Sequence, residues 1–186
     1  MPSSLSPDSL SLIIRALTFA AEKHRDQRRK DAGASPYINH PIALANVLVN
    51  EGGIEDAVVI CAALLHDTVE DTETTFREIE DHFGQAIADV VREVTDDKAL
   101  SKSERKRLQV QHAASASHAA RLVKLADKIC NLRDMMSSPP AGWDLQRRIE
   151  YFEWAKRVVD QVAGTHPGLE TSFYLAYEKV QSLRDD

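Results

Sequence analysis

The chain has 186 residues, 43% of them hydrophobic and 28% charged, so it is long enough for one domain that buries a substantial core. Its formal net charge of −6 at pH 7 argues against a general nucleic-acid binder, although a local basic site for a small anion is compatible with it. No apolar stretch approaches the roughly 18 residues of a membrane span, and the N-terminus lacks the pattern of a secretory leader, so we expect neither feature.

The first predicted helix begins at a cap formed by Asp8 or Ser9, and its apolar residues recur at helical spacing to about residue 21. A polar loop follows. Between Glu22 and Lys30, five basic and two acidic residues give this loop a local charge of +3 in a protein that is acidic overall. Such a run is usually a solvated face, but the contrast also makes it a candidate contact for an anion.

A second helix is expected to be capped by Asn39 or His40, with Pro41 in its first turn, where a missing N–H group costs no hydrogen bond. This helix should end at residues 51–53, which include two glycines. A third helix, over about residues 55–67, is so densely apolar that we expect it to be buried.

The rest of the chain continues as helices joined by polar connections, and almost nothing alternates as a strand would. We predict these helices over residues 74–83, 86–95, 103–117, 119–135, 144–163 and 169–183. Two cysteines, Cys61 and Cys130, lie in apolar stretches without CxxC spacing, so we expect buried, reduced thiols in a cytoplasmic protein. The predicted fold is all-α, in one domain.

Ionisable residues gather directly after the most apolar run of the chain. Residues 58–65 lead into His66, Asp67, Glu70 and Asp71. If one helix continued through them, His66 would stack with Glu70 on one face, and Asp67 would stack with Asp71 on another. Charges at the end of a buried segment are costly unless they are paired, and a divalent cation would pair them. The alternative is that Glu70 and Asp71 merely begin a solvated loop.

Asp127 stands four residues before Asn131 inside another apolar helix, where a carboxylate needs a partner. Lys124 or Lys128 could be that partner, and so could a metal ion. Two imidazoles and two carboxylates could converge on one cation, and such a mixed set suits manganese or iron better than calcium or a structural zinc. These four residues are His40, His66, Asp67 and Asp127. A histidine at a helix start is, on its own, more often a capping or core residue.

Several motifs follow one another in order along the chain: HRDQRRK (24–30), YINHP (37–41), LLHDTVED (64–71), FG (83–84), VTD (94–96) and VKLADKICNLR (123–133). Together they resemble the HD-domain phosphohydrolases, and specifically the hydrolase half of the RelA/SpoT alarmone enzymes. A later segment, YFEWA (151–155), is similar to the free-standing members, the small alarmone hydrolases and the metazoan SpoT homolog. The chain has no room for a synthetase domain.

This resemblance implies an all-helical bundle that forms a single HD-type hydrolase domain over residues 1–186. The motif-bearing core would span about residues 10–135, and C-terminal helices would span about residues 144–183. It also implies that the four residues named above bind one Mn²⁺ or another divalent cation, and that Glu70 and Asp71 position or activate the attacking water and handle the leaving group's proton. The substrate contacts that it implies are Arg29, Lys30, Asn131, Arg147 and Tyr151.

Alternatives remain for several of these residues. Arg29 could stack on a purine while Lys30 pairs with phosphate, but Tyr151 and Trp154 could equally be core residues. His24 matches a family position, with a role that could be structural. The other histidines have no spacing that suggests ligation, and we expect them at the surface or in the core: His82, His112, His118 and His166.

The activity implied by the resemblance is removal of the 3′-pyrophosphate from the stringent-response alarmones ppGpp and pppGpp, which gives GDP or GTP and pyrophosphate. Related enzymes make two other substrates possible for the same site, the adenosine alarmone (p)ppApp and the ribose phosphate of NADPH. A non-catalytic nucleotide sensor and a generic helical interaction module are further alternatives. We expect no nucleic-acid or membrane partner, and the sequence leaves the oligomeric state open.

Overall fold

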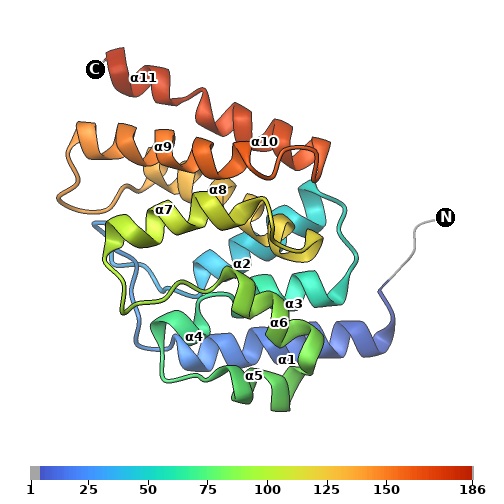
Figure 1. Cartoon of the computed structure of the whole chain (residues 1–186). Coiled ribbons are helices and arrows are strands. Elements are labelled where there is room, and N and C mark those ends of the chain that lie inside the picture. The colour runs from blue at the N-terminus through green and yellow to red at the C-terminus, as the bar shows by residue number, and fades with distance from the viewer. Residues whose placement is uncertain (1–4, 186) are drawn as a thin grey trace.

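The computed structural model describes residues 5–185, and within this range the regular elements are helices, with only isolated β-bridges between loops. The all-α prediction is therefore confirmed. Figure 1 shows the helices stacked from α1 and α5 at one end of the molecule to α10 and α11 at the other. Their bounds are α1 (Pro7–Lys23), α2 (Asn39–Asn46), the π-helical turn η1 (Val47–Glu51), α3 (Ala57–Leu65), α4 (Thr68–Asp71), α5 (Phe76–Phe83), α6 (Gln85–Val94), α7 (Lys102–Ala113), α8 (His118–Ser137), α9 (Leu145–Asp160), α10 (Pro167–Tyr177) and α11 (Val180–Asp185).

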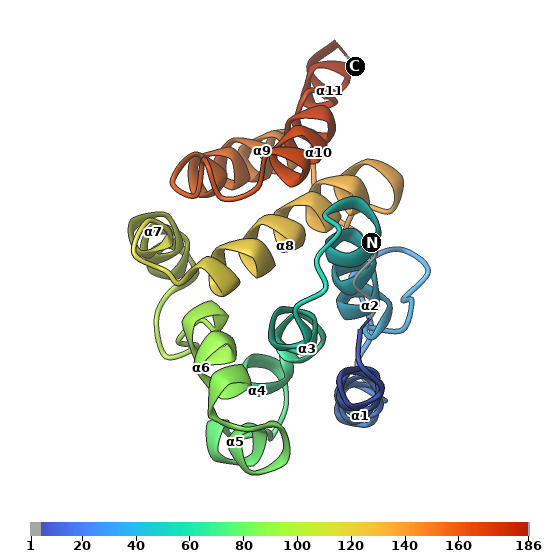
Figure 2. The ribbon, with the colours of Figure 1, turned by 90° about the vertical axis from the view of Figure 1, so that its right-hand side faces the viewer.

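Helix α3 lies in the middle of the lower part of the bundle, with α1, α2, α6 and α8 packed around it (Figure 2). Every residue from 59 to 65 is buried, which explains why this stretch has no polar face. Burying each Ile or Leu side chain of this helix contributes about 1.5–3 kcal/mol to folding. Helix α8 also contacts α9 and α10, so it joins the two ends of the bundle and brings its own polar residues beside the end of α3.

The start of α1 differs from the prediction. Ser6 is the N-cap, and its side chain accepts a hydrogen bond of 3.1 Å from the backbone N–H of Ser9, with Pro7 in the first turn. The predicted caps, Asp8 and Ser9, both lie inside the helix, where Asp8 adds a negative charge to the positive end of the helix dipole. Proline at the first helical position moves the cap to the residue before it.

The second helix begins without a side-chain cap, so the prediction of a cap at Asn39 or His40 was wrong. Ile38 is in the cap position. The first N–H groups of the helix are instead satisfied by backbone carbonyls of the preceding turn, because Asn39 N donates to Pro36 O and His40 N donates to Tyr37 O. The His40 side chain is therefore not used as a cap.

The predicted continuation of the third helix through residue 67 was also wrong. Helix α3 ends at Leu65, and α4 begins at Thr68. The Thr68 hydroxyl donates to Leu65 O at 2.7 Å, and the His66 ring lies 2.7 Å from Ala63 O, so side chains occupy carbonyls that a continuing helix would use. The expected stacking of His66 on Glu70 within one helix does not form.

The remaining predicted helices fall close to their ranges, with two exceptions. The helix predicted over residues 103–117 ends four residues earlier, at Ala113. The predicted helix over residues 169–183 is divided into α10 and α11. Cys61 and Cys130 are free and buried, as expected. Among the helices of the described range, none is long and apolar enough to cross a bilayer.

Candidate metal centre and catalytic site

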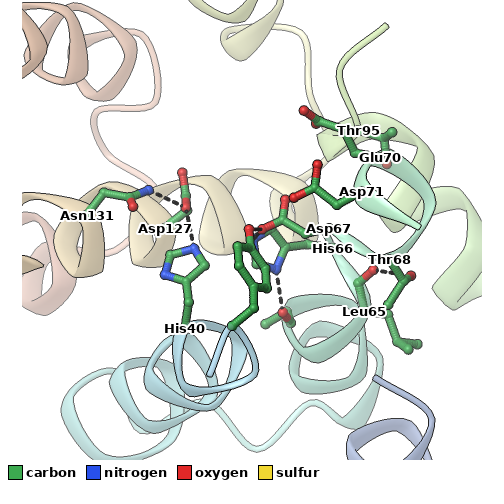
Figure 3. A network of polar contacts seen from close by, with 12 residues as sticks. His40, Leu65, His66, Asp67, Thr68, Glu70, Asp71, Thr95, Asp127 and Asn131 are labelled. Atoms are coloured by element: carbon green, nitrogen blue, oxygen red, sulfur yellow. Dashed lines mark hydrogen bonds and ion pairs between the residues drawn. The ribbon is translucent and has the colours of Figure 1, made fainter. Parts of the chain in front are cut away.

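Four candidate ligands from three segments of the chain lie close together between α2, the end of α3 and α8 (Figure 3). Potential ligand atoms of His40, His66 and Asp67 are all within 4.8 Å of one another. Asp127 approaches from α8, and its Oδ1 lies 3.2 Å from Nε2 of His40. The tertiary structure thus brings together residues that are separated by up to 87 positions in the sequence.

The His66 ring is held in one tautomer. Its Nδ1 lies 2.7 Å from the carbonyl oxygen of Ala63, which can only accept, so Nδ1 carries the hydrogen. The other ring nitrogen, Nε2, is buried without a hydrogen-bond partner in the described part of the chain, yet it lies 2.8 Å from Oδ2 of Asp67. In the neutral ring this would set a lone pair against a carboxylate. A proton or a metal ion removes that repulsion.

Titration of the pair follows from this geometry. Burial opposes charge on His66, but the Asp67 carboxylate outweighs it and raises the pKa of His66 to about 9. Burial alone would raise the pKa of Asp67, yet the adjacent His66 and His40 rings lower it. Tyr37 also donates its phenolic hydroxyl to Asp67 Oδ2. The Asp67 carboxylate is therefore ionised and fixed in place.

Asp127 has several partners inside α8 and beyond it. Lys128 Nζ lies 2.8 Å from Oδ2, and Asn131 donates to Oδ1 at 2.6 Å, so the sequence expectation that Asp127 and Asn131 share a face is confirmed. Burial opposes ionisation, but Lys128 and His40 outweigh it and hold the pKa of Asp127 well below its usual value. Lys128, rather than Lys124, is the neighbouring lysine that pairs with this carboxylate.

Glu70 lies at the side of the cluster, with 17% of its side chain exposed. Its carboxylate accepts hydrogen bonds from the backbone N–H of Asp96 at 3.1 Å and from Arg105 at 3.2 Å. Burial, followed by the charge of Asp67, raises the pKa of Glu70 to about 7. A carboxyl group with this pKa can both accept and donate a proton near neutral pH.

Asp71 is held on both oxygens. Gln27 donates to Oδ2 at 2.8 Å, and Lys98 donates to Oδ1. Glu70 and Asp71 both line a cavity and are mostly covered, so they do not simply begin a solvated loop.

Two cavities adjoin at the cluster, one of about 710 Å³ and one of about 270 Å³, which we call the outer and the inner cavity. The outer cavity is large enough for a nucleoside, and the inner cavity for phosphate groups. His40 of the metal cluster and Glu70 of the acidic pair line both cavities. The shared lining residues are Arg29, Tyr37, His40, Glu70, Arg105 and Asn131.

Four of the five expected substrate contacts line these cavities. Arg29 and Asn131 line both, Lys30 lines the outer cavity, and Tyr151 lines the inner one. Arg147 lines neither. Its guanidinium instead lies over the Trp143 ring, 4.3 Å from the centroid, although it is close enough to Lys102 on the inner cavity to lower the pKa of that lysine, after burial.

Sequence reasoning missed one wall of the inner cavity. Helix α7 was expected only as a charged helix, but it presents four side chains at spacings of i, i+3, i+4 and i+7. This helical spacing of basic and amide residues was the available signal. The four are Lys102, Arg105, Lys106 and Gln109. Three lysines of this wall and of α8 have no carboxylate within ion-pair distance among the described residues. They are Lys102, Lys106 and Lys124, and the pKa of each is lowered first by burial and then by neighbouring cations.

Trp154 and Tyr151 pack with the core and also line the inner cavity. Tyr151 packs on Trp143 and Trp154, and Trp154 is 6% exposed while it lines the inner cavity. The ammonium groups of Lys106 and Lys128 lie over the Trp154 ring at 4.8 and 4.3 Å from its centroid. The aromatic rings therefore support the cations of the cavity wall.

The HD domain family matches residues 16–151. The guanosine-3′,5′-bis(diphosphate) 3′-pyrophosphohydrolase MESH1 of Xenopus tropicalis is 59% identical over 86% of this chain and 89% of its own, and that of Homo sapiens is 58% identical over 85% and 88%.

Among solved structures, a metazoan ortholog of SpoT that hydrolyses ppGpp superposes with a TM-score of 0.88 at 48% identity, over 91% of this chain and 95% of its own. A protein from Listeria monocytogenes superposes with a TM-score of 0.63 at 30% identity, over 78% of this chain and 96% of its own. The family match includes the four candidate ligands and the acidic pair. The chain therefore belongs to the HD domain family, in the group that includes the metazoan ortholog of SpoT.

Proposed function

We propose that the chain is a metal-dependent hydrolase that removes the 3′-pyrophosphate from guanosine alarmones, converting ppGpp or pppGpp to GDP or GTP and pyrophosphate. The observation that carries this proposal is the meeting of His40, His66, Asp67 and Asp127 with an acidic pair where a nucleoside-sized cavity joins a basic one. The activity named for relatives that are 58–59% identical supports the same reaction here.

The donor set fits a divalent cation, for which we propose Mn²⁺. Imidazole nitrogen and carboxylate oxygen together suit manganese, and the buried Nε2 of His66 has no hydrogen-bond partner among the described residues. When bound, such a cation would polarise a phosphate oxygen and lower the pKa of a water molecule. The four candidate residues would hold it. The free, buried thiols of Cys61 and Cys130 fit a reducing compartment, which supports a cytoplasmic location.

The acidic pair would manage the protons of the reaction. Glu70 has a pKa of about 7, so its ionised form can take a proton from the attacking water and its acid form can return one to the departing 3′ oxygen of the ribose. Asp71, fixed on both oxygens by Gln27 and Lys98, would orient the water. Water adds to the phosphorus as its bond to the 3′ oxygen breaks. The products are pyrophosphate, which carries the oxygen of the water, and a nucleotide with a free 3′ hydroxyl.

The cavity walls would bind the rest of the nucleotide. Arg29 lies over the Tyr37 ring and pairs with Asp134 at 2.5 Å, so its planar group is held ready to stack on a base. Lys30 would pair with phosphate, and Asn131, already fixed on Asp127, would contact the ribose or base. Tyr151 would close the inner cavity beside the lysines. Arg147 would reach the distal phosphates only after leaving Trp143.

A nucleotide panel tests the proposal and its rivals together. The metal-stripped protein, with and without added Mn²⁺, is incubated with ppGpp, pppGpp, ppApp and NADPH, and the products are separated by chromatography. We expect GDP or GTP and pyrophosphate to form only with the metal. Faster turnover of ppApp or NADPH would assign the site to that substrate. Binding without turnover of any nucleotide would make the protein a sensor and overturn the proposal.

A further inference from the structure

A chain of hydrogen bonds connects a buried histidine with the acidic pair. Nδ1 of His24 lies 2.6 Å from Oε1 of Gln27, and Nε2 of Gln27 donates to Oδ2 of Asp71 at 2.8 Å. His24 is 1% exposed and lines neither cavity, whereas Gln27 lines the outer one. This series of hydrogen bonds therefore runs from the interior of the protein to the edge of the site.

The direction of each hydrogen bond in this chain is fixed. An ionised Asp71 can only accept, so Gln27 must turn its amide NH₂ group toward it and its carbonyl oxygen toward His24. That carbonyl oxygen in turn requires a hydrogen on Nδ1 of His24. Burial lowers the pKa of His24, which keeps the ring neutral with its single hydrogen on Nδ1. Nε2 of His24 has no hydrogen-bond partner among the described residues, so the hydrogen bond of Nδ1 is the polar contact that orients the ring.

Lys98, the other residue that binds the Asp71 carboxylate, is less constrained than Gln27. Lys98 belongs to the connection between α6 and α7, and half of its side chain is exposed, at 51%. A solvated ion pair of this kind contributes little to stability, and a phosphate anion would compete for the ammonium group. Gln27 carries no charge and has no such competitor. Its backbone is also anchored, because its carbonyl accepts from Tyr37 N at 3.1 Å.

We propose that Gln27 and His24 are positioning residues for Asp71. Gln27 fixes the rotation of the Asp71 carboxylate, and His24 fixes which end of the Gln27 amide faces it. Without the His24 donor the amide can turn, and a turned amide would set its carbonyl oxygen against the carboxylate. This inference rests on the proposed hydrolase function only in its kinetic consequence, since the hydrogen bonds themselves can be measured without a substrate.

The first test replaces Gln27 with methionine, which has a similar shape and no amide. We expect kcat on ppGpp to fall about 10–100-fold, the usual cost of losing such a supporting contact, while KM and Mn²⁺ affinity stay within about twofold. Gln85→Met on the surface of α6 is the matched control and should leave all three values unchanged. A raised KM with unchanged kcat would mean that Gln27 binds substrate instead, and unchanged kinetics would also overturn the proposal.

The second test changes the histidine. His24→Asn keeps a side-chain N–H donor and should retain more of kcat than His24→Leu, which loses the donor at a similar volume. If folding alone mattered, both variants would lose thermal stability and kcat in parallel. Comparable kcat in the two variants, after correction for the folded fraction, would show that His24 has no positioning role.

A third measurement is independent of activity. In the metal-free protein, the side-chain amide protons of Gln27 should exchange slowly with solvent, and the exchange should become fast in His24→Leu and in Asp71→Ala, as read by amide NMR. Fast exchange already in the wild type would overturn the positioning role. If the amide is protected but no nucleotide is hydrolysed, the proposed function fails while the hydrogen-bond chain stands.

Discussion

Nε2 of His66 lies 2.8 Å from Oδ2 of Asp67, while Nδ1 of the same ring is committed to the carbonyl oxygen of Ala63. The ring cannot rotate away or exchange its tautomer without losing that hydrogen bond. The two side chains therefore need a positive charge between or upon them. In the metal-free protein a proton supplies it, and in the proposed holoprotein a divalent cation does.

Asp67→Ala is expected to abolish both metal binding and hydrolysis. The substitution removes a carboxylate that is fixed by Tyr37 and His66 beside the other candidate ligands. Mn²⁺ affinity, followed by the EPR signal of the free ion, should fall by more than about 100-fold, and turnover should fall with it. Asp81→Ala, on the exposed side of α5, is the control. Full activity in Asp67→Ala would refute the metal role of this residue.

Metal binding should release a proton and become tighter as pH rises. The pKa of His66 is raised to about 9, so below that pH the ring carries a proton that a metal must displace. Apparent Mn²⁺ affinity should increase about tenfold per pH unit between pH 7 and 8 and level off above pH 9. Calorimetry in two buffers of different ionisation enthalpy should count one proton released. An affinity that is independent of pH would contradict the assignment of His66 as a ligand.

Glu70→Gln and Glu70→Ala should retain the metal but lose most turnover. Neither residue can exchange a proton, and general acid–base catalysis contributes about 10²–10⁴-fold to rate. The Glu70 carboxylate is bound to the backbone N–H of Asp96 and to Arg105 rather than to any of the four candidate ligands, so Mn²⁺ affinity should change little. Steady-state kinetics and a metal titration on the same preparation check both parts. Wild-type kcat in either variant would remove Glu70 from the proton transfers.

Glu70 should also make the metal-free protein less stable as pH rises. The folded pKa of Glu70 is about 7 against an ordinary value of 4.5, so the folded state holds this proton more tightly than the unfolded state does. Stability is therefore lost as pH rises from about 4.5 to 7. Glu70→Gln cannot ionise, so its stability relative to the wild type should increase by roughly 2–3 kcal/mol between pH 5 and 8.5 in urea unfolding. A constant difference would contradict the raised pKa.

Arg29→Ala should weaken substrate binding more than it slows chemistry. The guanidinium pairs with Asp134 and lies over Tyr37, so its removal takes away a prepared stacking surface and a positive charge. We expect KM for ppGpp to rise about tenfold or more, with kcat changed less than threefold. Arg107→Ala, whose guanidinium pairs with Glu104 outside both cavities, is the matched control. An unchanged KM would exclude Arg29 as a base contact.

Much of this molecule is determined by local sequence. Helical spacing of apolar residues gave the fold class and most helix positions, because each helix must bury one face to be stable. The unbroken apolar run before His66 predicted that α3 is buried, and the i, i+4 spacing predicted that Asn131 and Asp127 share one helix face, where they form a hydrogen bond. Such features depend only on neighbours along the same helix.

The site itself was decided by tertiary structure. The end of α3 at Leu65 is a local effect that apolar periodicity did not reveal, because His66 and Thr68 hydrogen-bond to helix carbonyls three residues before them. No local rule brings Gln27 to Asp71, or places the basic face of α7 opposite α8, because these contacts join residues 44 and 19 positions apart in the sequence. Spacing along a chain fixes which side chains share a face. Only the packing of separate helices, driven by burial of their apolar faces, fixes which faces meet.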